Sequence, residues 1–163
     1  PLCFSGMVFE RMLDADEEPL VFGVSDKLLN NNLVMFDRAT STLWNQLLGT
    51  AIDGKREGAL LKIYPSRVMS WDMFKRAYPN GQALSFETGA ERDYTQDPYL
   101  GYLTDDRIFF PLTRMDAGLP AKEIVYGAMD ENGRAIAARE LFENATQVFW
   151  FCWAGMYPET EMK

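Results

Sequence analysis

The chain has 163 residues, 47% of them hydrophobic and 13% aromatic, so it can bury a sizeable core and does not have the composition of a disordered segment. Its net charge of −8, with no local cluster of Lys or Arg, disfavours anionic membrane surfaces and predicts no nucleic-acid partner. The absence of histidine excludes His-based catalytic triads and His-ligated zinc sites. No apolar run reaches the roughly 20 residues of a transmembrane helix, so no membrane span is expected in this chain.

The N-terminal third of the sequence predicts β-structure. Alternation of side chains over residues 1–11 is typical of a strand, and the acidic run at 14–18 predicts a solvated hairpin tip. A short strand at 21–24, an asparagine-rich turn at 30–32 and a strand at 33–38 then predict a hairpin. This hairpin leads into a segment rich in Thr and Ser.

Residues 35–46 hold the strongest candidate for a binding site. Polar side chains with defined hydrogen-bonding geometry are mixed here with large apolar ones, which is unusual for a surface hairpin. An arginine beside aromatic rings suits a carboxylate or sugar-like ligand, through bidentate hydrogen bonds and ring stacking. In the structural alternative, Asp37 or Arg38 pairs internally and fixes the hairpin. The candidate ligand-binding residues of this segment are Asp37, Arg38, Thr40, Trp44 and Gln46.

A strand at 59–64 and a short helix at 70–78 follow. Ser70 is the expected N-cap of the helix, and Pro79 is expected to end it. Three aromatic residues recur at helical spacing, so we expect one helical face to pack on the sheet: Trp71, Phe74 and Tyr78.

After a further expected strand at 82–86, residues 88–102 lose regular periodicity. An irregular loop of this length is uncommon unless it is functional or tightly packed. We therefore assign Asp93, Asp97 and Tyr99 to the candidate pocket. A weaker alternative is hydrolysis by paired carboxylates, Asp37 with Asp93 or Asp97, but nothing in the sequence fixes their separation.

The C-terminal part again predicts strands. Asp-Glu-Asn-Gly at 130–133 is a strong hairpin turn. The expected elements are strands at 108–112, 123–128, 134–138 and 148–154, with a helical turn at 139–144. Together these patterns predict one β-rich α+β domain over residues 1–163, with a mainly antiparallel sheet and one or two short helices.

The sequence resembles the bacterial and archaeal family catalogued as Domain of Unknown Function 3179. The resemblance rests on four blocks in the expected order along nearly the whole chain: FGVSDKLLNNNLVMFDRATSTLWNQLLGTAIDG (22–54), LKIYPSRVMSWDMFKRAYPNGQALS (61–85), RDYTQDPYLGY (92–102) and FWFCWAGMYPETEM (149–162). It implies no catalytic residues or cofactor, so the sequence does not decide whether the protein is an enzyme.

The same resemblance raises a thiol or metal hypothesis. Family members typically carry Cys-Pro-Leu-Cys, and Pro1-Leu2-Cys3 matches its last three residues, so we expect this chain to be a fragment that lacks an N-terminal part. Cys3 is then a candidate ligand for a soft metal such as copper. The sequence leaves open whether Cys3 forms a disulfide with Cys152.

The functional expectation has two forms. The first is an extracytoplasmic binding or structural domain, with a small-molecule or protein partner at the pocket around residues 35–46. The second is a thiol or metal site that uses Cys3. The extracytoplasmic location is inferred from the family resemblance and from the acidic, aromatic-rich composition.

Overall fold

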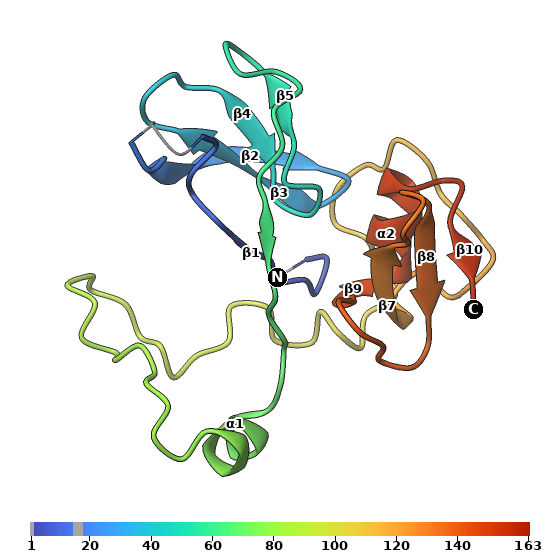
Figure 1. Ribbon diagram of the computed structural model, residues 1–163. Coiled ribbons are helices and arrows are strands. Elements are labelled where there is room, and N and C mark those ends of the chain that lie inside the picture. Colours follow the sequence, from blue (N-terminus) through green and yellow to red (C-terminus); the bar gives the residue numbers. More distant parts are fainter. Residues whose placement is uncertain (1, 15–17) are drawn as a thin grey trace.

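A computed structural model describes residues 2–14 and 18–163 and contains two four-stranded sheets (Figure 1). The first sheet, blue to cyan in Figure 1, is antiparallel and has the strand order β2-β3-β4-β5. Its strands are β2 (Phe22–Leu29), β3 (Asn32–Asp37), β4 (Leu43–Asn45) and β5 (Ala51–Asp53). The predicted hairpin is therefore confirmed, and β4 and β5 extend it into a sheet.

The second sheet, orange to red in Figure 1, has the order β10-β8-β7-β9 and is antiparallel except for β10 beside β8. It consists of β7 (Ile124–Met129), β8 (Ala135–Ala138), β9 (Thr146–Phe149) and β10 (Glu161–Met162). The predicted turn at 130–133 joins β7 to β8, with the Asp130 amide donating to the Arg134 carbonyl at 2.8 Å. Helix α2 (Trp150–Met156) follows β9 without a break.

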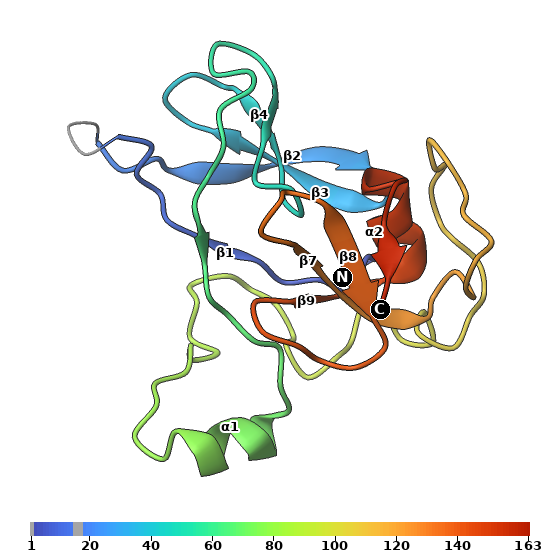
Figure 2. The same ribbon diagram turned by 45° about the vertical axis from the view of Figure 1, so that its right-hand side comes forward.

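A two-stranded pair and a second short helix complete the regular structure. β1 (Val8–Phe9) pairs with β6 (Ile63–Tyr64), and α1 (Trp71–Ala77) lies beyond β6. Both views place α1 at the end of the molecule away from the first sheet (Figures 1 and 2). Two short helices with mainly antiparallel strands confirm the β-rich α+β class.

The buried apolar residues form two clusters. The smaller cluster packs under the first sheet around Trp44, which is fully buried. The larger cluster lies between the second sheet and α2, and it includes five consecutive buried residues of that helix, 150–154. Cys3 joins this larger cluster from the other end of the chain, through a disulfide to Cys152.

The asparagine turn connects the first sheet to the second half of the chain. Asn30 and Asn31 have φ angles of 48° and 63°, the left-handed pair that a type I′ hairpin turn requires and that asparagine tolerates. Both side chains are buried. Asn30 accepts from the Thr113 amide at 2.8 Å and donates to the Gly155 carbonyl at 3.2 Å, at the end of α2. Asn31 bonds both the amide and the carbonyl of Phe110, at 3.0 and 2.9 Å.

This arrangement predicts the effect of an Asn31→Gly substitution. Glycine keeps the left-handed turn but removes both bonds to Phe110, so we expect the free energy of unfolding to fall by about 1–3 kcal/mol. Urea unfolding measures the change. Gly58 also has positive φ, and an added Cβ there would contact no neighbouring atom, so Gly58→Asn serves as the reference. It should change the free energy of unfolding by less than Asn31→Gly does. Equal stability of Asn31→Gly and the wild type would contradict the role of the turn.

Several predicted elements are wrong. The apolar run 148–154 is a strand only to Phe149 and then becomes helical, because periodicity cannot separate a short buried strand from a buried helix. The amides of Trp150 and Phe151 donate to the carbonyls of Glu123 and Ala121. These bonds satisfy the first two amides of α2, which has no side-chain cap. The expected strands at 82–86 and 108–112 and the helical turn at 139–144 are absent from the described chain.

Near the N-terminus, a strand was expected over residues 1–11, but among the described residues of this range only β1 is a strand. Of the hairpin tip expected at 14–18, residues 15–17 lie outside the described part of the chain, as does Pro1. The strand expected at 59–64 is reduced to β6 and a single bridge between Thr50 and Leu60.

The helix at 71–77 forms as predicted, but its packing does not. Ser70 caps it by accepting from the Met73 amide at 3.2 Å. None of its residues is buried, and the Trp71 and Tyr78 side chains are 57% and 55% exposed. The three aromatic rings pack on one another instead, with the Trp71 and Phe74 centroids 5.4 Å apart. The expectation that this face packs on a sheet is therefore wrong.

Candidate functional site

Asp37 is the centre of a buried polar network at the turn between β3 and β4. Its side chain is fully buried, and Oδ1 accepts from the Thr40 amide at 2.6 Å. Oδ2 accepts from the Trp44 indole N–H at 3.0 Å, and the Thr40 hydroxyl lies 2.9 Å from both carboxylate oxygens. Burial raises the Asp37 pKa, but the bonds from Trp44 and Thr40, helped by the Arg56 charge, outweigh it and lower the pKa below its ordinary value.

Arg38 and Gln46, two further candidate ligand-binding residues of this segment, do not bond to Asp37. Arg38 is exposed and its guanidinium lies 5.6 Å from the Phe36 ring centroid. Gln46 is half-buried and accepts from Asn32 at 2.9 Å. Asp37 and Trp44 are therefore bonded internally, as in the structural alternative, and a direct contact of this segment with a ligand stays a prediction.

The second predicted loop does not join this network. Asp93 and Asp97 are exposed and accept from backbone amides two residues along, Thr95 at 2.9 Å and Tyr99 at 2.8 Å. Tyr99 is 38% exposed. Both views show residues 88–101, in yellow-green, near the α1 end of the molecule and away from the first sheet (Figures 1 and 2). Among the described residues, the Asp37 carboxylate accepts hydrogen bonds from Thr40 and Trp44, and Arg56 adds a favourable charge.

Cys3, the candidate metal ligand, is bonded to Cys152, with the two Cα atoms 5.6 Å apart. A disulfide sulfur is not a thiolate, so Cys3 is not a free soft-metal ligand in this structure. Within residues 2–14 and 18–163, no group of three His, Cys, Asp or Glu side chains is placed to hold a metal ion. A metal role for Cys3 would require the reduced chain and stays a prediction.

A cavity lies elsewhere, where β1 and β6 meet β7 and α2. Its volume is about 580 Å³, within the range of small-molecule sites. Aromatic and apolar side chains form much of the wall, and Arg67, Asn144 and Thr146 supply polar groups. The aromatic lining residues are Tyr78, Phe142, Trp153 and Tyr157.

Trp153 in this cavity wall has a buried polar group without a hydrogen-bond partner among the described residues. Its ring lies against Gly127 of β7, where an added Cβ would be 2.5 Å from ring atoms, and its centroid is 4.5 Å from that of Tyr157. Its indole N–H is buried and has no hydrogen-bond partner in the described part of the chain. Such a donor costs about 1–3 kcal/mol when it is left unsatisfied. The sequence prediction missed this residue because it treated 148–154 as a strand, although Trp153 and Tyr157 have helical i, i+4 spacing.

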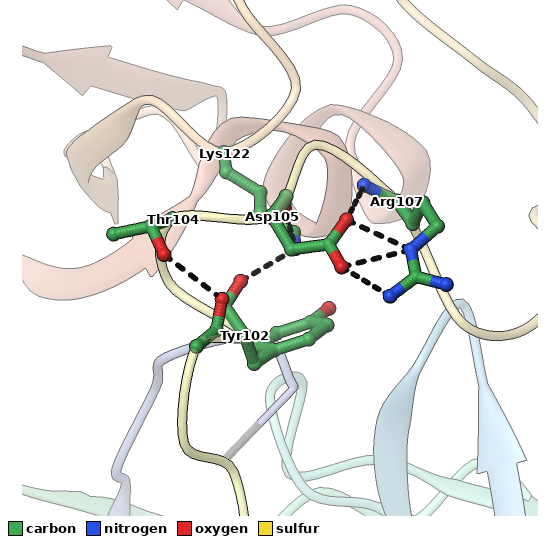
Figure 3. A network of polar contacts seen from close by, with 6 residues as sticks. Tyr102, Thr104, Asp105, Arg107 and Lys122 are labelled. Carbon is green, nitrogen blue, oxygen red and sulfur yellow. Dashed lines mark hydrogen bonds and ion pairs between the residues drawn. The ribbon is translucent and has the colours of Figure 1, made fainter.

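A second polar network fastens the end of the long loop to the second sheet (Figure 3). The Lys122 ammonium lies 3.5 Å from the Tyr102 ring centroid and donates to the carbonyls of Tyr102 and Asp105. Burial lowers the pKa of Lys122. Hydrogen bonds from Arg107 hold the pKa of Asp105 at about 2. Because the ammonium is engaged by two carbonyls and a ring, this network is best explained as a structural clamp.

The described residues thus define a β-rich α+β protein with two four-stranded sheets and a two-stranded pair, crosslinked by a disulfide, with a cavity of mixed aromatic and polar character. The chain belongs to the family described as "Protein of unknown function (DUF3179)", whose model matches residues 1–146. Neither a curated protein nor a solved structure matches it. No helix in the described residues is long and apolar enough to cross a membrane.

Proposed function

We propose that the protein is an extracytoplasmic binding domain and that its ligand occupies the cavity beside Trp153. The observation that carries this proposal is the buried indole N–H without a partner in the described chain. The group is shielded from water, so an acceptor reaches it only when a bound molecule shifts the side chains that cover it. A ligand that supplies the acceptor removes the desolvation cost of the donor, and this gain favours the occupied state.

The character of the cavity wall supports an organic ligand. Small-molecule sites combine apolar and aromatic walls with a few polar groups that fix orientation. Trp153, Tyr157 and Phe142 provide flat surfaces, and Asn144 and Thr146 provide donors and acceptors. We therefore expect a small ring-containing molecule with a hydrogen-bond acceptor.

The extracytoplasmic location is supported by the disulfide between Cys3 and Cys152. Structural disulfides persist in oxidising compartments and are rare in the reducing cytosol. Both cysteines are almost fully buried, which fits a structural crosslink.

In this proposal the network around Asp37 is a structural support. Both oxygens of Asp37 are occupied by Thr40 and Trp44, and neither Asp37 nor Trp44 lines the cavity. Leu47, two residues after β4 of the first sheet, is part of the cavity wall. The network therefore supports the cavity wall indirectly, because it holds β4, the strand that precedes Leu47.

A matched pair of Trp→Phe variants tests the proposal. Ring-containing compounds with an acceptor are screened by ligand-observed NMR against the wild type, Trp153→Phe and Trp71→Phe. Trp71 is exposed on α1 and is not part of the cavity, so its variant should keep wild-type affinity. We expect Trp153→Phe to raise the dissociation constant of hits by about tenfold, the value of one buried hydrogen bond. Hits that bind all three proteins equally would place the site elsewhere.

A further inference from the structure

Two charged side chains of opposite sign lie in the wall of the cavity beside Trp153. Among the described residues that line this cavity, Arg67 and Glu143 are the charged ones, and the others are apolar, aromatic or neutral polar. Within the described part of the chain, neither has an ion pair or a side-chain hydrogen bond. Both charges are therefore available to a bound molecule.

The backbone on either side of Arg67 is held in place. β6 ends at Tyr64, which pairs with β1, and the ring of Pro65 fixes the next backbone φ angle. Directly after Arg67, the Val68 side chain lies near the N-terminal segment, where a Cβ added at Gly6 would be 3.9 Å from it. An anchored segment thus carries the cation at the cavity wall.

Glu143 reaches the cavity from the loop between β8 and β9. The Ala145 amide donates to the Phe142 carbonyl at 3.3 Å, and Asn144 between them has a φ of 59°, which asparagine tolerates. Phe142 is half-buried and lines the same cavity. This turn therefore brings a carboxylate to a wall that also offers an aromatic ring.

The two charges together favour a ligand that carries both signs. An anion attracted by Arg67 is repelled by Glu143, and a cation meets the reverse, whereas a zwitterion can place each of its charges beside the opposite one. The net charge of −8 of the whole chain disfavours a simple anion at longer range as well.

The remaining wall indicates which zwitterions fit. Trp153, Tyr157 and Phe142 provide ring surfaces, and the volume of about 580 Å³ is within the range of small-molecule sites. Aromatic α-amino acids combine a ring, an ammonium and a carboxylate in one small molecule. Their carboxylate oxygens are also hydrogen-bond acceptors, which the ligand of this cavity is expected to carry.

We propose that the cavity binds a zwitterionic ring compound of the aromatic α-amino acid class, with its carboxylate at Arg67 and its ammonium at Glu143. This inference rests on the proposed function, because it uses the same cavity, and it adds the charges that select the ligand. Arg67 and Glu143 are then specificity-determining residues. Both side chains are exposed and outside the buried clusters, so their substitution should leave the fold intact.

Four compounds that differ in charge test the proposal by isothermal titration calorimetry at about pH 6, where α-amino groups are protonated. L-phenylalanine carries both charges, hydrocinnamate only the carboxylate, L-phenylalaninamide only the ammonium, and hydrocinnamamide neither. All four keep the ring and a carbonyl acceptor. We expect L-phenylalanine to bind most tightly and the loss of either charge to raise the dissociation constant about fivefold, the upper range for an ion pair open to solvent.

Substitutions assign each charge to its residue. In Arg67→Gln the preference for a carboxylate over an amide should disappear, and in Glu143→Gln the preference for an ammonium should disappear. Each variant should keep the preference that depends on the other residue. Arg114→Gln and Glu87→Gln are the matched controls, because both side chains are exposed and outside the cavity, and they should keep the wild-type order of affinities.

Equal affinity of the wild type for all four compounds would overturn the inference, as would a preference for one charge alone or an order of affinities that persists in both cavity variants. Binding that Trp153→Phe weakens would in each of these cases still support the proposed cavity. If none of the four binds, the inference fails. Neutral fragments that bind in a Trp153-dependent way would then leave the proposed function standing, and the absence of any bound fragment would overturn both.

Discussion

Reduction of the disulfide between Cys3 and Cys152 is expected to lower the free energy of unfolding by about 2–5 kcal/mol. The bond joins residues 149 positions apart, so it restricts the unfolded chain over almost its whole length. It also ties the N-terminal segment to α2, and the amide of Phe149, the last residue of β9, donates to the Cys3 carbonyl at 2.9 Å. Urea unfolding with and without a reductant measures the loss.

The double variant Cys3→Ser/Cys152→Ser provides the control for this prediction. It should unfold at the urea concentration found for the reduced wild type or below it, because each new hydroxyl is placed in an apolar cluster. It should also be insensitive to the reductant. A wild-type midpoint that does not move on complete reduction would show that the crosslink does not stabilise the fold.

Replacement of Asp37 by alanine is expected to cost about 3–5 kcal/mol, the range for breaking a buried charged network. The substitution leaves the Trp44 indole N–H and the Thr40 amide without their acceptor, and Trp44 is fully buried. Asp97→Ala is the matched control, because Asp97 also accepts from a nearby amide but is exposed. Its cost should stay below about 1 kcal/mol. Similar losses in the two variants would contradict a structural role for the Asp37 network.

The lowered pKa of Asp37 also predicts a pH dependence. A carboxyl group whose pKa is lower in the folded state stabilises the fold above its unfolded value of about 3.9, and this stabilisation is lost as the pH falls through the folded value. The stability difference between the wild type and Asp37→Asn should therefore shrink below about pH 4. Unfolding measured from about pH 6 downward tests this, and a constant difference would contradict it.

The sequence was most informative where local chemistry decides the structure. The asparagine turn, the Asp130–Gly133 turn and the Ser70 cap are each set by side chains that bond nearby backbone or tolerate positive φ, and all three were predicted. The internal bonding of Asp37 could also be foreseen as the structural alternative, because polar groups placed beside Trp44 need internal partners, whereas Arg38 of the same segment is exposed.

The sequence was least informative where long-range contacts decide the structure. Trp71 and Phe74 have the spacing of a buried helical face, yet α1 is exposed, because periodicity does not reveal whether a sheet lies opposite. The helical state of Trp150–Met156 depends on carbonyls near residue 122, about 30 positions away. The cavity beside Trp153 is assembled from seven separate parts of the chain, so no single motif indicated it.

The most direct test of this account is a crystal of the full chain soaked with ring-containing fragments that carry a hydrogen-bond acceptor. We predict electron density for a fragment in the cavity, with its acceptor within hydrogen-bonding distance of the Trp153 indole nitrogen. Density at the turn near Asp37 and Arg38, with the cavity beside Trp153 left empty, would contradict the proposed site.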